Sequence, residues 1–418
     1  MQNIVQSKVS GALALAGLGW AAAAIVAPPA QAQTYAVLHR FAGSAKDGEN
    51  PAAGLAMNTA GNLYGTTVEG PGCIPTACAP SPGMIFELTS TGTETVLYSF
   101  KGTPDGANPY GGLILDSSNN AYGTTRAGGT SNMGAVFKLT ATGEKVLYSF
   151  TGPPNDGAFP YAGVIADPAG NFYGTTNAGG ASNSGAVFKV DSAGTETVLY
   201  SFTGGADGAF PYGGLLRNSA GNLYGTTSAG GISTGNCYPS GCGVVFMVTP
   251  AGKETVLHSF TGSPDGASPY AGLIADSSDN LYGTTFNGGT GACTNGCGVV
   301  FELDKAGTES VLHSFTGYPV DGAFPSAGLV RDSSGNLYGT ATYGGGSDSG
   351  VVFELATTGT ETVLYSFLGT TDGAVPRAGL ILDSTGNLYG TTYAGGDTGA
   401  ACGGEPADTC GVVFKLKP

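Results

Sequence analysis

The tripeptide Tyr-Gly-Thr occurs seven times in this chain, and this repetition limits the possible folds more than any other feature. The copies lie 51 to 58 residues apart, with their tyrosines at Tyr64, Tyr122, Tyr173, Tyr224, Tyr282, Tyr338 and Tyr389. Each unit holds four short runs rich in β-branched and aromatic residues, separated by Gly, Asn, Asp and Ser, which is typical of strands joined by tight turns. The pattern predicts an all-β fold, a seven-bladed β-propeller with four antiparallel strands per blade.

The turns between the predicted strands, which we name A to D along each unit, have residues suited to hairpins. Between strands A and B stand Gly61, Asn119, Gly170, Gly221, Asp279, Gly335 and Gly386. Gly, Asn and Asp tolerate the left-handed backbone conformation that such turns need. Between strands C and D a glycine occurs only six times, at Gly92, Gly143, Gly194, Gly252, Gly307 and Gly359.

The missing seventh turn indicates how the ring closes. The chain enters the repeat in a D strand at residues 35–41 and leaves it in a C strand at residues 411–418. If the first strand completes the last blade, all seven blades have four strands and no edge stays open. An open solenoid is the alternative, and it leaves the complementary half-blades unexplained. We therefore predict a single propeller domain over residues 33–418.

The repeat unit resembles a known family. Its consensus, GLIxDSxGNLYGTTxxGG followed by GVVFKLxxxGTETVLYSFxGxxDGAxPxAG, is similar to the GloVer tandem repeat of bacterial choice-of-anchor surface proteins, over essentially the whole chain after residue 32. The resemblance implies export and usually a C-terminal sorting anchor, a pattern from which this sequence departs at residues 415–418. The layout is also similar to kelch repeats, although Phe stands where kelch units usually have Trp. The family resemblance implies no defined activity.

Residues 1–32 have the layout of a secretory signal peptide. Lys8 supplies a positive charge, residues 9–27 are apolar and small, and Ala30-Gln31-Ala32 is a small-x-small cleavage site. A retained membrane anchor is the alternative interpretation. Cleavage would remove one basic residue and no acid, leaving 14 basic and 30 acidic residues. Such an acidic chain repels phosphate backbones and anionic lipid. We expect a secreted monomer, periplasmic or extracellular, that binds no nucleic acid and inserts in no membrane after cleavage.

All eight cysteines fall in the predicted B–C loops as four local pairs. These are Cys73 with Cys78, Cys237 with Cys242, Cys293 with Cys297, and Cys402 with Cys410. Local pairs in the loops of an exported chain predict disulfides. Zinc is the alternative, but each loop offers only two ligands and no histidine lies nearby. We expect neither a metal nor another cofactor.

The D–A and B–C loops differ among the units, whereas the A–B and C–D turns are short and uniform. In a propeller the two variable loops emerge on the same face, which is therefore the predicted binding face. At the start of strand A, the units carry Ala52, Tyr110, Tyr161, Tyr212, Tyr270, Ser326 and Arg377. We expect the four tyrosines, Arg377, and the nearby Phe159 and Phe210 to rim the channel mouth as an aromatic arc suited to a sugar chain. Packing between neighbouring loops is the alternative.

Each D–A loop contains the motif DGxxP, with Asp47, Asp105, Asp156, Asp207, Asp265, Asp321 and Asp372. Calcium binding is one hypothesis. Capping of backbone N–H groups within each loop is the simpler one, because a metal loop needs several oxygens close in sequence and each of these supplies one acid.

The sequence contains no clear catalytic centre. His39, His258 and His313 stand where other units have a strand D tyrosine, which indicates a packing role. Glu69, Asp397, Glu405 and Asp408 lie in the B–C loops of the first and last units, where two carboxylates could act on a glycoside. We expect a non-enzymatic binding or surface-interaction module with a polysaccharide or a surface protein as partner. A glycosidase or lyase using loop carboxylates and a structural envelope protein are the alternatives.

Overall fold

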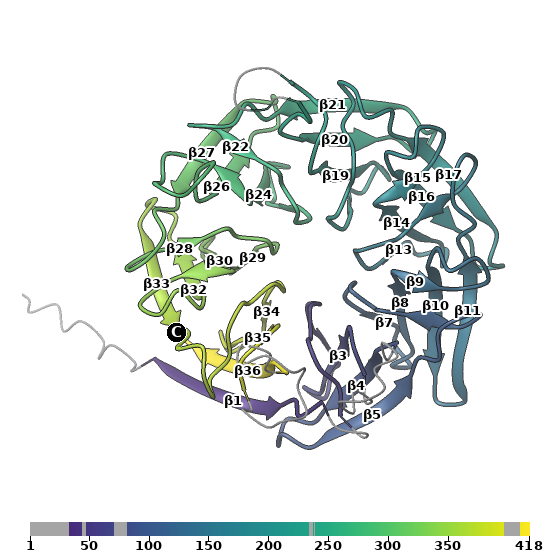
Figure 1. Ribbon diagram of the computed structural model, residues 1–418, viewed down its shortest axis with the longest axis horizontal. Helices are drawn as coiled ribbons and strands as arrows, with labels where there is room; N and C mark the ends of the chain where they lie inside the picture. The colour runs from purple at the N-terminus through teal and green to yellow at the C-terminus, as the bar shows by residue number, and fades with distance from the viewer. Residues whose placement is uncertain (1–32, 44–46, 71–81, 234–236, 238, 397–409) are drawn as a thin grey trace, which may run out of the picture. The chain divides into compact units, whose positions relative to one another are not determined.

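The computed structural model describes residues 33–43, 47–70, 82–233, 237, 239–396 and 410–418. Every extended regular element in these ranges is a β-strand, and seven sheets of four antiparallel strands follow one another along the chain. Figure 1 shows the sheets as blades around a common centre, so the predicted seven-bladed propeller is confirmed. No helix in the described ranges is long and apolar enough to cross a membrane. The predicted signal peptide, residues 1–32, lies outside the described residues.

In every blade the strands pair in the order A, B, C, D, with strand A innermost (Figure 1). Blade 1 comprises β2 (Ala56–Met57), β3 (Leu63–Thr67), β4 (Met84–Leu88) and β5 (Glu94–Ser99). Blade 2 comprises β7 (Ile114–Leu115), β8 (Ala121–Thr125), β10 (Ala135–Thr140) and β11 (Gly143–Ser149). Blade 3 comprises β13 (Ile165–Ala166), β14 (Phe172–Thr176), β16 (Ala186–Val190) and β17 (Glu196–Ser201). Blade 4 comprises β18 (Leu216–Arg217), β19 (Leu223–Thr227), β20 (Val244–Val248) and β21 (Glu254–Ser259).

The remaining three blades repeat this layout. Blade 5 comprises β23 (Ile274–Ala275), β24 (Leu281–Thr285), β26 (Val299–Leu303) and β27 (Glu309–Ser314). Blade 6 comprises β29 (Val330–Arg331), β30 (Leu337–Ala341), β32 (Val351–Leu355) and β33 (Glu361–Ser366). Blade 7 comprises β34 (Ile381–Leu382), β35 (Leu388–Thr392) and β36 (Val412–Lys417), and its fourth strand is β1 (Thr34–Arg40).

The ring closes through the two ends of the repeat array. Strand β1 pairs antiparallel with β36, with Thr34 opposite Lys417 and Arg40 opposite Val412. Figure 1 shows the purple first strand alongside the yellow last one. This pairing confirms the closure that the missing C–D turn predicted, and it leaves the sheet of blade 7 with the same four strands as the others.

The turn residues also behave as their chemistry predicts. Asn119 and Asp279, which replace glycine in the A–B turn, have φ values of 60° and 67°. The glycines of the other five A–B turns and all six C–D turns have positive φ as well. The substitutions within the repeat therefore follow a backbone requirement for the left-handed region.

Each position of the Tyr-Gly-Thr tripeptide has a structural role. In blade 1, a Cβ at Gly65 would lie 2.5 Å from the ring of Phe86, which is fully buried, so glycine makes room for the core phenylalanine. Tyr64 donates a hydrogen bond to Glu87 at 2.8 Å. The threonine hydroxyl donates to a backbone carbonyl at the start of the next blade, and Thr391 closes this series by donating to Ala53 at 3.2 Å. The recurring tripeptide therefore belongs to the scaffold.

A ring of seven glycines lies where the inner strands of neighbouring blades approach one another. Its members lie two residues before strand A of each blade, at Gly54, Gly112, Gly163, Gly214, Gly272, Gly328 and Gly379. A Cβ at Gly163 would overlap the carbonyl oxygen of Gly112, and a Cβ at Gly272 would lie 2.8 Å from that of Gly214. At these two positions the close approach of neighbouring blades therefore depends on a residue without a side chain, whereas the other five have no atom closer than 3.3 Å to such a Cβ.

Candidate functional site

Short backbone bridges tie the D–A loop of each blade to its B–C loop. Four blades have two-stranded sheets: β6 (Gly106–Ala107) with β9 (Ala127–Gly128), β12 (Gly157–Ala158) with β15 (Ala178–Gly179), β22 (Gly266–Ala267) with β25 (Asn287–Gly288), and β28 (Gly322–Ala323) with β31 (Tyr343–Gly344). The other three have single bridges, Glu49 with Glu69, Ala209 with Ala229, and Ala374 with Ala394. Both variable loops of a blade thus lie on one side of the ring, which we call the loop face.

A central cavity of about 500 Å³ opens on the loop face. All seven residues predicted at the start of strand A line it, together with three that follow strand B. The full lining is Ala52, Tyr110, Tyr161, Tyr212, Tyr270, Phe286, Ser326, Thr342, Tyr343 and Arg377. The four predicted tyrosines and Arg377 are therefore brought together around one cavity, which we call the aromatic cavity.

Aromatic rings follow one another around the aromatic cavity without interruption from blade 2 to blade 6. The ring centroids of Tyr110 and Tyr161 are 5.2 Å apart, and those of Tyr161 and Tyr212 are 4.8 Å apart. The series continues through Tyr270, Phe286, Phe324 and Tyr343 with centroid separations of 5.0, 5.2, 5.0 and 6.1 Å. Phe324 connects Phe286 to Tyr343 and lies outside the cavity lining. Tilted and edge-to-face pairs at these distances stabilise one another and hold each ring in place.

Two arginines add positive charge beside these rings. The Nε–H of Arg126 donates to the Tyr161 hydroxyl at 2.7 Å, and its guanidinium lies 5.2 Å from the ring centroid of that tyrosine. On the other side of the cavity, the guanidinium of Arg377 lies 4.1 Å from the centroid of the Tyr393 ring. Arg377 lines the cavity, whereas Arg126 contacts a lining tyrosine from outside the lining, so both place positive charge near the cavity in a protein whose net charge is −15.

Three of the cavity tyrosines have hydroxyls that stay protonated over the physiological range. Burial raises the pKa of Tyr110, Tyr212 and Tyr270 above the usual value for a phenol. For Tyr110 the neighbouring Tyr393 adds to this effect, and Arg126 opposes it. The cavity therefore presents neutral aromatic faces together with O–H groups that can donate or accept hydrogen bonds.

Phe159 and Phe210, which we expected at the channel mouth, lie outside the lining of the aromatic cavity. The Phe159 ring lies 5.6 Å from the Arg126 guanidinium, whereas Phe210 is 41% exposed. Both have φ near +56°, as do Phe324 and Val375 at the equivalent positions. A bulky residue in this left-handed region is strained, while the Asn50 and Asn108 of blades 1 and 2 tolerate it.

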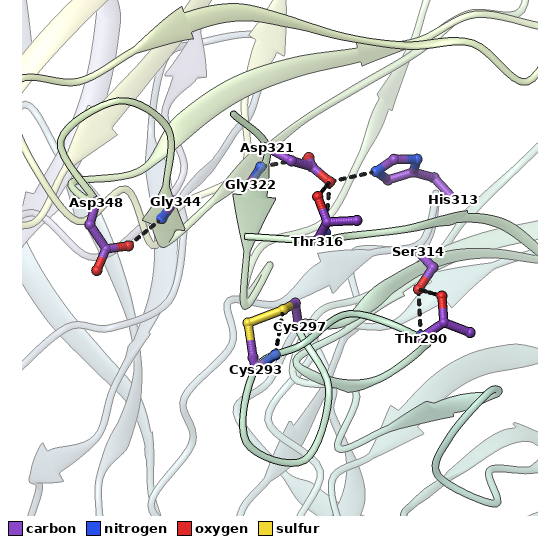
Figure 2. Close-up of a disulfide and its surroundings, with 10 residues drawn as sticks. All are labelled: Thr290, Cys293, Cys297, His313, Ser314, Thr316, Asp321, Gly322, Gly344 and Asp348. Carbon is purple, nitrogen blue, oxygen red and sulfur yellow. Dashed lines mark hydrogen bonds and ion pairs between the residues drawn. A yellow bond between two sulfur atoms is a disulfide. The ribbon is translucent and has the colours of Figure 1, made fainter. Parts of the chain in front are cut away.

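Two of the predicted disulfides are present on the loop face. Cys237 bonds to Cys242, and Cys293 bonds to Cys297, each closing its B–C loop. Figure 2 shows the second pair beside the loop that contains Thr316 and Asp321. Cys410 is also disulfide-bonded, and its predicted partner Cys402 lies outside the described residues, as do Cys73 and Cys78.

A second cavity of about 620 Å³ lies between the two disulfide-closed loops of blades 4 and 5. Its lining is largely backbone, serine and asparagine, with Cys237, Ser240, Cys242, Ser268, Asn287 and Asn295 among its members. Unlike the aromatic cavity, it has no aromatic side chain among the described residues that line it, so it offers hydrogen bonds without a stacking surface.

The D–A loop aspartates cap their own loops. Asp156 Oδ2 accepts hydrogen bonds from the Thr151 amide at 2.6 Å and from the Tyr148 hydroxyl at 2.8 Å, while Oδ1 accepts from the Gly157 amide. The three histidines take the tyrosine's place, with His39, His258 and His313 Nε2 lying 3.2, 3.4 and 3.3 Å from the aspartates of their loops. A backbone amide donates to the aspartate in each of the seven loops, so the capping interpretation accounts for all seven positions.

Of the four carboxylates considered for an enzyme, the structure describes only Glu69. Glu69 pairs through its backbone with Glu49, at the bridge between the two loops of blade 1. Asp397, Glu405 and Asp408 lie outside the described residues. The lining of the aromatic cavity, as the described residues define it, contains no carboxylate and no histidine.

Comparison with known proteins decides the family. The model of the Gloeobacter/Verrucomicrobia repeat matches residues 23–238 and 232–404, which is most of the chain. The chain belongs to this family. The resemblance of the repeat unit to GloVer repeats is therefore confirmed. No match is found among the curated proteins.

Solved structures share the fold of this Gloeobacter/Verrucomicrobia repeat chain at low sequence identity. Virginiamycin B lyase from Staphylococcus aureus is 14% identical with a TM-score of 0.56, and the match covers 92% of this chain and 99% of the lyase. PorZ, a surface component of the type-IX secretion system of Porphyromonas gingivalis, is 15% identical with a TM-score of 0.51, covering 88% of this chain and 46% of PorZ. These likenesses concern the fold alone.

Sequence reasoning missed two aromatic residues of the cavity, Phe286 and Tyr343. Phe286 directly follows strand B, and Tyr343 stands one residue further along in blade 6. The position directly after the strand differs in every Gloeobacter/Verrucomicrobia repeat unit of this chain: Val68, Arg126, Asn177, Ser228, Phe286, Thr342 and Tyr393. The signal was therefore a position that varies between units directly beside a tripeptide that recurs in all of them. Its side chains in blades 5 and 6 line the same cavity as those at the start of strand A.

Proposed function

We propose that this protein is an exported, non-enzymatic binding module whose aromatic cavity holds a carbohydrate chain. The observation that carries the proposal is the continuous series of seven aromatic rings from Tyr110 to Tyr343, six of which line a cavity of about 500 Å³. Volumes of this size are common for ligand sites, which combine an apolar lining with a few polar groups.

The chemistry of the lining fits a sugar. Pyranose rings present C–H groups that pack on aromatic faces, while their hydroxyls need hydrogen-bond partners at the edges. Tyr110, Tyr212 and Tyr270 offer both, because each has an apolar ring and a hydroxyl that burial keeps protonated. Ser326, Thr342 and Arg377 add polar groups to the lining. A single preformed cavity surrounded by rings therefore suits a polymer end or a short segment of chain.

Two observations support the rest of the proposal. Disulfides such as Cys237–Cys242 and Cys293–Cys297 form and persist outside the cytoplasm, which favours export. The absence of carboxylate and histidine from the lining, within the described residues, favours binding over hydrolysis, which needs a general acid.

The test measures binding of the purified protein to a panel of soluble polysaccharides. The affinity for the polysaccharide that binds is then compared with the affinities of two variants at one position. Tyr212→Ala removes a ring from the middle of the series, and Tyr212→Phe keeps the ring but removes the hydroxyl. Loss of one stacking face, at roughly 25 cal/mol per Å² over about 60 Å², corresponds to about 1.5 kcal/mol or roughly tenfold in Kd. We expect Tyr212→Ala to show this loss and Tyr212→Phe to bind within about threefold of wild type.

Two results would overturn the proposal. One is a wild-type protein that binds no member of the panel. The other is a bound polysaccharide whose affinity is unchanged in Tyr212→Ala, since the ligand would then lie elsewhere, for example in the cavity between the disulfide-closed loops.

A further inference from the structure

The outer junctions between consecutive blades hold an unexplained set of carboxylates. At six junctions a glutamate stands at or next to the start of the outer strand: Glu94, Glu144, Glu196, Glu254, Glu309 and Glu361. In each of them the Oε1 atom is shielded from solvent and has no hydrogen-bond partner. A shielded carboxylate oxygen without a partner is costly, so a proton shared with a neighbouring carboxyl, an ordered water or a cation would stabilise each of these sites.

Each of these glutamates lies near the D–A loop aspartate of the same junction, whose charge adds to burial in raising the pKa of the glutamate. Burial raises the pKa of Glu309, and the charge of Asp265 raises it further. Asp321 acts on Glu361 in the same way. Two carboxylates that share a shielded site need either a proton between them or a cation.

Histidine replaces tyrosine at three junctions, and at two of them it lies close enough to both carboxylates to form a compact cluster; the group of His39, Asp47 and Glu94 is not one of these two. His258, Asp265 and Glu309 form one cluster, and His313, Asp321 and Glu361 form the other, with the ligating atoms of each cluster all within 4.8 Å of one another. Figure 2 shows the His313 imidazole pointing toward the Asp321 carboxylate, and their closest atoms are 3.3 Å apart. In both clusters the histidine side chain is 19% exposed, so small ions and water can reach it.

We propose that these two clusters, His258–Asp265–Glu309 and His313–Asp321–Glu361, are binding sites for a divalent transition-metal ion of the zinc type. One imidazole nitrogen and two carboxylate oxygens are a ligand set that such ions accept, with the remaining positions taken by water. The ion would satisfy the orphaned glutamate oxygen and neutralise the paired carboxylates.

The geometry allows coordination after small side-chain movements. Atoms that lie within 4.8 Å of one another can all be reached from a central point about 2.8 Å or less from each. Zinc bonds to nitrogen and oxygen are about 2.0–2.2 Å long, so each ligand needs to move inward by less than about 1 Å. Rotations of the half-buried glutamate and histidine side chains can supply such movements.

The tyrosine junctions provide the contrast. At the junction between blades 3 and 4, the Tyr200 hydroxyl donates a hydrogen bond to Asp207 at 2.9 Å. Burial and this hydrogen bond raise the pKa of Tyr200, so the group stays protonated and cannot act as a phenolate ligand. Glu254 beside it then has only a proton to share with Asp207. The proposal therefore assigns metal to the two histidine clusters and none to the tyrosine junctions with Asp105, Asp156 and Asp207.

A bound ion would have a structural consequence for the loop face. Each cluster joins the end of one outer strand, β21 or β27, to the start of the next, β27 or β33. The D–A loops that supply Asp265 and Asp321 also supply Tyr270 and Phe324 to the aromatic series. The two ions would thus fix the loops that carry these rings.

The test compares metal uptake by the full secreted chain with that of matched variants. The double variant His258→Tyr/His313→Tyr introduces the residue that the repeat already uses at four equivalent positions, so it is expected to fold. After equilibrium dialysis against micromolar Zn²⁺ with excess Mg²⁺, we expect the wild type to retain two more equivalents of zinc than this variant. Glu309→Gln/Glu361→Gln should lose the same two equivalents, whereas Glu196→Gln/Glu254→Gln, at tyrosine junctions, should lose none. With Co²⁺ as the probe, the wild type should show visible d–d absorption that the histidine variant lacks.

Three results would overturn the proposal. Equal zinc uptake by the wild type and the folded histidine variant would assign the metal to other surface carboxylates. Loss of zinc in the tyrosine-junction variant would show that histidine is not decisive. No retained zinc in the wild type would mean that a shared proton completes the clusters.

Discussion

Two glycine-to-alanine substitutions in the ring of glycines, Gly163→Ala and Gly54→Ala, should differ in their effect on the stability of the protein. A Cβ at Gly163 would overlap the carbonyl oxygen of Gly112 and lie 3.1 Å from its carbonyl carbon. At Gly54, the equivalent position of blade 1, the nearest atom is the Gly379 carbonyl oxygen at 3.5 Å, which is ordinary van der Waals contact. Both glycines lie two residues before the inner strand of their blade, so the comparison isolates the local approach of two blades.

The expected magnitudes follow from this geometry. In Gly163→Ala the obstacle is backbone, which moves less readily than a flexible side chain, so the substitution should cost about 1–3 kcal/mol of overpacking strain. Alanine also lowers the entropy of the unfolded chain, which returns about 0.4–1 kcal/mol in both variants. We expect Gly163→Ala to be destabilised by about 1–2 kcal/mol and Gly54→Ala to be neutral or slightly stabilised.

The assay is urea unfolding of both variants, followed by far-UV circular dichroism and compared through the transition midpoints. A ring that closes through β1 and β36 should unfold cooperatively, so the midpoint reports the whole propeller. Equal midpoints for the two alanine variants would refute the reasoning, because they would show that the blades do not approach as closely at Gly163 as the backbone positions indicate.

Three further predictions concern the loops and the outer junctions. Phe210→Asn should raise stability by about 0.5–1 kcal/mol, because asparagine tolerates the φ of 56°; a lower unfolding midpoint would contradict this. The pKa values of Glu144, Glu196 and Glu254 are raised to about 7 by burial first and by nearby aspartates second. Between the ordinary pKa of a glutamate and about 7, the folded state therefore binds more protons than the unfolded state. The metal-free protein should lose stability as pH rises through this window, and its stability should level off above it. Urea midpoints from pH 4.5 to 8 should fall less in Glu144→Gln/Glu196→Gln/Glu254→Gln, and identical slopes would reject the assignment. Cys293→Ser/Cys297→Ser should lower stability by no more than about 2–3 kcal/mol, because the closed loop is short; thermal unfolding under non-reducing conditions measures this.

The repetition in the sequence is enough to predict the fold because each unit repeats both its strands and its turn chemistry. Asn119 and Asp279 indicate a left-handed turn position by their residue type alone, and the missing C–D turn indicates which strands close the ring. The same repetition separates scaffold from site. Tyr-Gly-Thr and the loop aspartates recur in every blade, and each has a packing or capping role.

The aromatic cavity could be predicted only in part, for a physical reason. Tyr110, Tyr161, Tyr212 and Tyr270 share one position of the repeat, so their meeting at the cavity follows from the symmetry of the ring. Phe286 and Tyr343 reach the same cavity from another loop, and that convergence depends on how two loops of one blade lie side by side.

The clusters of His258 and His313 could not be predicted from the repeat alone. Each combines the end of one outer strand with the start of the next, about 50 residues later in the sequence. Repeat spacing predicts that neighbouring blades pack together, but it does not give the crossing angle that brings Glu309 to Asp265. In the sequence the histidines are simple replacements of tyrosine, which is also how they bond to their loops.

The most direct test of the central claim is a crystal structure of the protein with an oligosaccharide from the polysaccharide that binds best. The account predicts a sugar ring stacked on Tyr161 or Tyr212 within the aromatic cavity, with tyrosine hydroxyls bonded to its edge. A ligand bound in the cavity between the two disulfide-closed loops, or on the outer strands, with the aromatic cavity empty, would contradict it.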